Sequence, residues 1–144
     1  MPHLYLGIDS GTQGTKTVLV DGESHRILAQ SYKAYPLNEY ENGGREQDPQ
    51  LWIAAVIGTI DAVLAEAGAD RNEVAAIGVS GQQHGFVPLD EDDEVIRDAK
   101  LWCDTETHPE ADALTEALGG SSKAIESIGN TVAVGFTASK IAWL

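Results

Sequence analysis

The sequence predicts an α/β fold, because three strand-like segments are followed by a helix and by a further apolar strand. The three strand-like segments lie at residues 4–8, 17–20 and 26–35. The helix begins at Pro49, and the further strand covers residues 74–80. Elements in this order form a sheet that carries helices on its faces.

Turn and capping residues define where these elements begin and end. Asp21-Gly22 is a strong turn signal between the second and third segments, so we expect the first three strands to form an antiparallel meander. Asp48 is suited to the N-cap and Pro49 to the first helical position. Gly68 supplies the stop of this helix.

The remainder of the chain is expected to alternate between loops, a hairpin and short helices. Residues 36–47 are polar and contain Gly and Pro, which predicts a loop. Short apolar segments on both sides of the acidic turn at residues 90–93 predict a hairpin. Further helices are expected at residues 109–118, 122–128 and 137–144.

The composition is strongly acidic. The 144 residues include 23 Asp and Glu against 9 Lys and Arg, which gives a formal net charge of −14. A nucleic-acid binder needs a basic face that displaces counterions, and an anionic membrane surface repels an acidic protein. We therefore expect neither partner. The acidity serves solubility or reflects a salt-rich habitat, and both explanations stay open.

Cys103 is the only cysteine, so no intrachain disulfide is expected. A single thiol fits a reducing compartment, which predicts a cytoplasmic protein, and we interpret it as a small packing residue. The sequence shows no signal-peptide pattern, and no apolar run approaches the ~20 residues that cross a bilayer.

The final helical pattern stops on Trp143 and Leu144 without a capping residue. Two large apolar side chains at a chain end have no further chain to pack against. We therefore expect residues 1–144 to be an N-terminal piece of a longer protein.

A loop rich in glycine and hydroxyl groups, residues 10–15, follows the strand that ends in Asp9. Such a loop presents backbone N–H groups to an anion, and the adjacent carboxylate can hold a hydrated metal ion. It is not a Walker A motif, because Ser10 and Thr15 stand where glycine is required. It resembles the first phosphate loop of the superfamily that unites sugar kinases, chaperone ATPases and actin. An ordinary hairpin with an Asx turn at Asp9 is the alternative.

A second loop follows the buried strand at residues 74–80. Gly81 and Gly85 bracket Gln82, Gln83 and His84, an arrangement that suits a polyhydroxylated ligand. The imidazole can donate to or accept from a sugar hydroxyl. The alternatives are a structural histidine and a loop glutamine bonded to backbone.

The third motif is Leu101-Trp102-Cys103-Asp104. An indole face packs on sugar C–H groups, and a neighbouring carboxylate accepts from sugar hydroxyls. Trp102 is equally well interpreted as a core aromatic, and Asp104 as the cap of the helix that follows.

Together the three motifs resemble the FGGY family of carbohydrate kinases, from Gly7-Ile8-Asp9 to residues 135–140. The resemblance implies the actin-like, ribonuclease H-like α/β fold, with a mixed sheet and flanking helices. Residues 1–144 are then an incomplete N-terminal domain, without its remainder and without the C-terminal ATP-binding domain.

The resemblance assigns roles to single residues. Asp9 orients hydrated Mg²⁺, and the catalytic base is an Asp beyond residue 144. The group that approaches the phosphates of ATP is Ser10, Gly11, Thr12, Gln13, Gly14, Thr15 and Lys16. The group that contacts the sugar is Gln82, Gln83, His84, Trp102 and Asp104.

Within the family, the loop at residues 80–85 is similar to that of xylulokinases. This similarity implies ATP-dependent phosphorylation of D-xylulose to D-xylulose 5-phosphate, in the full-length enzyme and not in the fragment alone. A kinase of ribulose, a pentitol or gluconate is the alternative, as is a non-catalytic sugar- or nucleotide-binding member. The oligomeric state is left open, and a homodimer is compatible with it.

Overall fold

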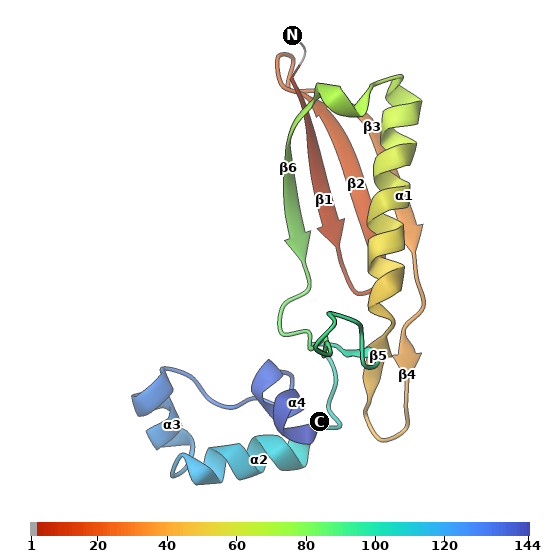
Figure 1. Cartoon of the computed structure of the whole chain (residues 1–144). Helices are drawn as coiled ribbons and strands as arrows, with labels where there is room; N and C mark the ends of the chain where they lie inside the picture. Colours follow the sequence, from red (N-terminus) through yellow and green to blue (C-terminus); the bar gives the residue numbers. More distant parts are fainter. Residues whose placement is uncertain (1–2) are drawn as a thin grey trace. The chain divides into compact units, whose positions relative to one another are not determined.

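The computed structural model describes residues 3–144, which form two compact units. Unit 1 consists of the chain up to Pro36 together with Pro49–Gln82, and unit 2 consists of Leu37–Asp48 together with Gln83–Leu144. Each unit contains its own sheet (Figure 1). The α/β class expected from the sequence is confirmed.

Unit 1 is built on a four-stranded mixed sheet with the order β3-β2-β1-β6 (Figure 1). β1 (Leu4–Ser10), β2 (Gly14–Asp21) and β3 (Ile27–Ala34) form the expected antiparallel meander. β6 (Val74–Gly81) pairs with β1 in parallel. A parallel pair needs a crossover connection, and α1 lies in it.

The helix α1 (Pro49–Ala67) lies along one face of this sheet (Figure 1). The hydroxyl groups of Thr59 and Thr17 lie 2.7 Å apart in the interior, which ties the helix to β2. The buried apolar cluster between helix and sheet consists of Leu4, Leu6, Leu19, Ala29, Val63 and Leu64.

Among residues 3–144, α1 is the one helix whose length and composition suffice to cross a bilayer. This differs from the expectation that no apolar run approaches that length. The finding is weak evidence for a membrane segment, because core helices that pack on a sheet meet the same criterion. One face of α1 packs on the sheet through Ala55, Thr59 and Val63, and 22% of the helix is buried within the chain.

The hairpin between β1 and β2 is tighter than predicted. β1 and β2 stay paired up to Ser10 and Thr15, and β2 begins at Gly14. The connecting loop is therefore residues 11–13 rather than the predicted 10–15. The predicted turn after β2 is present, since Asp21 Oδ1 accepts from the N–H groups of Glu23 (2.8 Å) and Ser24 (3.1 Å). These backbone hydrogen bonds, from Ser24 first and then from Glu23, lower the pKa of Asp21.

Unit 2 contains a smaller antiparallel sheet. Its strands are β4 (Asn38–Glu39), β5 (Arg45–Gln47) and β7 (Ala99–Lys100), in the order β4-β5-β7. The prediction that residues 36–47 are only loop is wrong, because β4 and β5 form a hairpin there. Strands of two or three residues carry too little periodicity to be seen in a sequence.

The helices of unit 2 are α2 (His108–Ala117), α3 (Ser121–Ile128) and α4 (Thr137–Trp143), within one or two residues of their predicted positions. Gly119 and Gly120 follow α2 with positive φ angles, in agreement with the predicted stop.

The predicted hairpin around the acidic turn at residues 90–93 is present only in part. It reduces to the isolated bridge between Leu89 and Val95, and Phe86 pairs instead with Lys100 of β7.

The core of unit 1 can be tested at Leu19, which is fully buried, against Ile27 of β3, which is 61% exposed. Leu19→Ala removes buried methyl groups and leaves a cavity, so we expect the free energy of unfolding to fall by about 2–5 kcal/mol. The control Ile27→Ala should change it by about 0.5 kcal/mol. Urea unfolding followed by circular dichroism measures both, and equal effects would contradict the assigned core.

Candidate functional site

The loop after β1 is held in a fixed shape by its surroundings in unit 1. Gly11 N donates to Gly14 O at 3.0 Å, which closes the turn. The Tyr35 hydroxyl donates to Gly11 O and lies 3.4 Å from Ser10 Oγ. A Cβ atom at Gly14 would lie 2.7 Å from the backbone carbonyl oxygen of Lys33, so only glycine fits there.

The predicted phosphate-binding residues differ in burial. Thr15 is fully buried, and its Oγ1 donates to Ser10 Oγ at 3.3 Å. Gly14 is buried as well, whereas Gln13 and Lys16 are exposed. Ser10, Gly11 and Thr12 are half-buried. Gly14 and Thr15 therefore support the loop from the interior, and the side chains of Gln13 and Lys16 face solvent.

Asp9 lies at the edge of the sheet where β1 and β6 both end. It is exposed, and it stands opposite Lys16 on β2 and opposite Ser80 on β6. Because β1 and β6 are parallel, their carboxyl ends meet at the same edge, which is where ligands bind in open α/β sheets.

Gln82 connects the first motif to the second within unit 1. Thr12 Oγ1 donates to Gln82 Oε1 at 3.1 Å, and Gln82 Nε2 donates to Gly11 O at 3.3 Å. The sequence predicts Thr12 as a phosphate contact and Gln82 as a sugar contact, but does not predict that they touch. The geometry shows that Gln82 braces the loop after β1.

In unit 2, His84 has a left-handed backbone conformation with φ = 56°. Its ring stacks on Phe136, with the ring centroids 4.2 Å apart and the planes inclined by 20°. Gln83 and His84 are both exposed, so the imidazole is accessible to a ligand despite the stacking.

Trp102 is 48% exposed, which does not fit the alternative of a core aromatic. Its backbone is closely packed, because a Cβ atom at Gly135 would lie 2.4 Å from Trp102 O. Gly135 therefore allows the segment before α4 to approach the third motif.

Asp104 is the one predicted sugar contact that the structure buries completely. Its Oδ2 accepts from Arg45 N (2.8 Å) and from Lys100 Nζ (3.0 Å), and its Oδ1 accepts from Glu106 N (3.1 Å). The alternative of a helix cap is wrong, because Thr107 is the N-cap of α2. The sugar contact stays a prediction, while the geometry favours a structural role.

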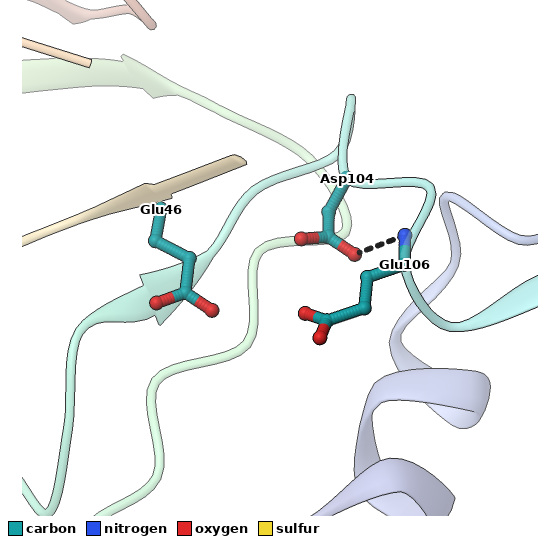
Figure 2. A group of neighbouring side chains, drawn as sticks. All are labelled: Glu46, Asp104 and Glu106. Carbon is teal, nitrogen blue, oxygen red and sulfur yellow. Dashed lines mark hydrogen bonds between the residues drawn. The ribbon is translucent and has the colours of Figure 1, made fainter. Parts of the chain in front are cut away.

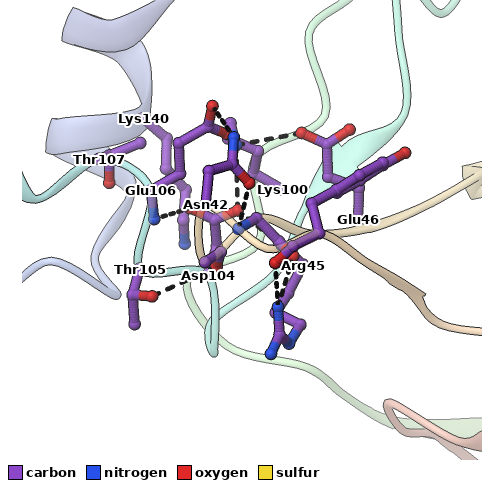
Figure 3. A network of polar contacts seen from close by, with 12 residues as sticks. Asn42, Arg45, Glu46, Lys100, Asp104, Thr105, Glu106, Thr107 and Lys140 are labelled. Carbon is purple, nitrogen blue, oxygen red and sulfur yellow. Dashed lines mark hydrogen bonds and ion pairs between the residues drawn. The ribbon is translucent and has the colours of Figure 1, made fainter.

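The carboxylates of Glu46, Asp104 and Glu106 point toward one another (Figure 2). One oxygen of each carboxylate lies within 4.8 Å of the other two. This spacing suits a metal ion, but Lys100 Nζ lies 3.0 Å from both Glu46 Oε1 and Asp104 Oδ2, and also pairs with Glu106 (Figure 3). The cluster is therefore an ion-pair network centred on a lysine.

The pKa of Lys100 reflects this network. Burial lowers the pKa, but the hydrogen bonds that the ammonium donates to Glu106, Asp104 and Glu46 outweigh burial and raise it. The Trp143 ring centroid lies 4.2 Å from Lys100 Nζ and 4.4 Å from Arg97 Cζ. Lys100 thus stays charged, and its charge is compensated on several sides.

Sequence reasoning predicts no role for Lys140, yet its side chain is fully buried. Its Nζ donates to His84 O and to Gly135 O, both at 2.7 Å. Burial lowers its pKa to about 8. A lone lysine before an apolar helix end is typical of a solvated surface, so no local pattern would have found it.

The fold and the two loops define an α/β domain of the sugar-kinase type. A family model described as the FGGY family of carbohydrate kinases, N-terminal domain, matches residues 4–144. The chain therefore belongs to this family, as expected from its motifs.

The relatives include a xylulose kinase from Haemophilus influenzae, 43% identical over 97% of this chain and 29% of that protein. A crystal structure of a xyloylose kinase from Brucella ovis is 36% identical, with a TM-score of 0.87, over 98% of this chain and 29% of that chain. A gluconate kinase from Lactobacillus acidophilus is 28% identical, with a TM-score of 0.82, over 100% of this chain and 28% of that chain. The chain spans less than a third of the length of these proteins.

The structural role of Asp104 can be tested with Asp104→Asn, and Asp112→Asn serves as the control because Asp112 is exposed. Asp104→Asn removes one buried charge that compensates Lys100, so the free energy of unfolding should fall by about 3–5 kcal/mol. The control should change it by about 0.5 kcal/mol. Chemical denaturation measures both. An unchanged free energy of unfolding for Asp104→Asn would argue against a stabilising role of the Lys100 network.

Proposed function

We propose that the chain is the N-terminal part of an ATP-dependent kinase that converts D-xylulose to D-xylulose 5-phosphate. The observation that carries this proposal is the meeting of two loops at the carboxyl ends of β1 and β6, joined by Gln82. The residues after β6 belong to the loop that is similar to xylulokinases, and the chain is 43% identical to a xylulose kinase.

We also propose that residues 1–144 are an incomplete domain. β6 lies at the edge of the sheet, and its residues Ile77 and Val79 are 54% and 71% exposed. An exposed apolar edge strand invites pairing with further chain. The relatives are more than three times as long, so they contain enough residues to supply that chain, the catalytic base and an adenosine site.

The proposed role of Asp9 is to orient hydrated Mg²⁺ beside the phosphates of ATP. Its exposed carboxylate at the sheet edge fits a hydrated hard cation, which prefers oxygen ligands. The bound ion would neutralise charge on the transferred phosphoryl group. Residues 11–13 and Lys16 are then placed to approach the phosphates, and Tyr35 and Gln82 keep the loop in shape.

The proposed sugar contacts are Gln83, His84 and Trp102. All three side chains are exposed, so they are accessible to a hydroxylated ligand. The imidazole exchanges hydrogen bonds with sugar hydroxyls, and the indole face covers C–H groups. Gln82 contributes mainly by holding the loop after β1.

The substrates of the whole protein are thus proposed to be a small sugar and ATP, in the cytoplasm. A net charge of −14 disfavours nucleic acid and anionic membranes as partners. A homodimer is compatible with the proposal but is not required by it.

A kinase for another sugar is the second candidate, because the gluconate kinase shares this fold with a TM-score of 0.82. A coupled assay of ADP release by the native full-length protein separates the two. D-xylulose, D-ribulose, a pentitol and gluconate are compared, and we expect kcat/KM to be at least about tenfold higher for D-xylulose. A higher kcat/KM for gluconate would identify gluconate as the substrate in place of D-xylulose. No turnover with any compound would indicate a binding protein. Residues 1–144 alone should show no turnover.

The two loops should affect different kinetic constants. Asp9→Asn in the full-length protein weakens the hold on the Mg²⁺ that would neutralise charge during transfer, so kcat should fall by about 10²–10³ with D-xylulose binding retained. His84→Ala removes a contact made before and during transfer, so the KM for D-xylulose should rise by about tenfold. Steady-state kinetics measure both, and an unchanged kcat for Asp9→Asn or an unchanged KM for His84→Ala would withdraw that residue's role.

A further inference from the structure

Lys140 is a buried cation that the proposed reaction does not use. It lies on α4 with no exposed surface, and its Nζ donates to the carbonyl groups of His84 and Gly135, both at 2.7 Å. These two residues lie 51 positions apart in the chain but meet at one ammonium group. Figure 3 shows Lys140 at the side of the Lys100 network.

The surroundings of Lys140 compensate little of the free-energy cost of burying its charge. Its hydrogen-bond acceptors are neutral carbonyls, whereas Lys100 pairs with carboxylates. Burial lowers its pKa to about 8, and Asp104 only partly offsets this effect. An apolar side chain in this position would bind neither carbonyl, so the ammonium supplies two contacts that hydrophobic packing cannot replace.

His84 is held in a conformation that needs support. Its φ of 56° is left-handed, which costs a residue with a Cβ atom about 1–2 kcal/mol. The Lys140 bond fixes the His84 carbonyl, and the stacking on Phe136 fixes the ring. The second Lys140 bond fixes Gly135, which directly precedes Phe136 in the chain. One ammonium therefore orients both the histidine and the ring that it stacks on.

We propose that Lys140 is a positioning residue for sugar recognition, which clamps His84 and Phe136 so that the imidazole is presented in one orientation. This inference rests on the proposed function, because it takes His84 as a sugar contact. Lys140 touches no reacting group in this assignment and acts only through His84.

The test compares Lys140→Met with Lys123→Met, a matched change at an exposed lysine of α3, in the native full-length protein. Methionine fills the volume but donates no hydrogen bond. We expect Lys140→Met to raise the KM for D-xylulose about tenfold, with kcat and the KM for ATP within about threefold of the unmodified protein. Lys123→Met should change none of them.

A double-mutant cycle separates positioning from a general structural effect. If Lys140 acts through His84, then Lys140→Met should add no further rise in KM once His84 has been replaced by Ala. A KM that multiplies across the two changes would overturn the proposal. So would a rise of less than about twofold for Lys140→Met, or a common loss in kcat and both KM values.

If Lys140→Met does not fold, the unmodified protein with 13C-labelled lysine side chains provides the answer. Addition of D-xylulose without ATP should shift the Cε resonance of Lys140 but not that of Lys123, and an unmoved Lys140 resonance would overturn the clamp.

Failure of the proposed function is recognised separately, as no turnover of D-xylulose by the unmodified protein. In that case, provided that Lys140→Met folds, the upfield shift that Phe136 imposes on the His84 ring protons still tests the clamp without any substrate, because the shift should be lost in Lys140→Met.

Discussion

The parallel pairing of β1 with β6 is the contact on which the proposed phosphate site depends. It places Asp9 beside Ser80 and brings Gln82 within hydrogen-bond reach of Thr12 and Gly11. A parallel pair needs a crossover, and α1 both supplies it and covers one face of the sheet. The buried core beneath α1 therefore determines where the exposed loop residues lie.

Unit 2 depends on two buried lysines with opposite surroundings. Lys100 lies among carboxylates, and they raise its pKa, whereas Lys140 bonds to carbonyls and burial lowers its pKa to about 8. The first lysine joins β5, β7 and the turn before α2 through Glu46, Asp104 and Glu106. The second holds the loop of His84. The same side-chain type thus stabilises the scaffold in one place and orients the proposed sugar contact in the other.

Much of the fold was predictable where the signal is local. The turn at Asp21-Gly22, the helix start at Pro49 and the stop at Gly119-Gly120 depend on the backbone preferences of single residues, and each is found in the structure. The hairpin of β4 and β5 was missed, because segments this short show no periodicity. The loop after β1 was predicted too long, since Thr15 looks like a ligand-binding hydroxyl but is buried in the sheet.

The sequence by itself determined the α/β class, the family and the identity of the two exposed loops, because glycine, carboxylate and hydroxyl patterns are written in neighbouring residues. Only the tertiary structure decided what several of those side chains do. The structure adds a buried network around Asp104, whose carboxylate accepts from Arg45 N and Lys100 Nζ, while its sugar contact stays a prediction. It also reveals the bond from the Lys140 ammonium to the His84 carbonyl, which no sequence pattern predicts. The physical reason is that burial and hydrogen-bond partners come from residues far apart in the chain, such as Thr12 and Gln82, and no local pattern encodes those contacts.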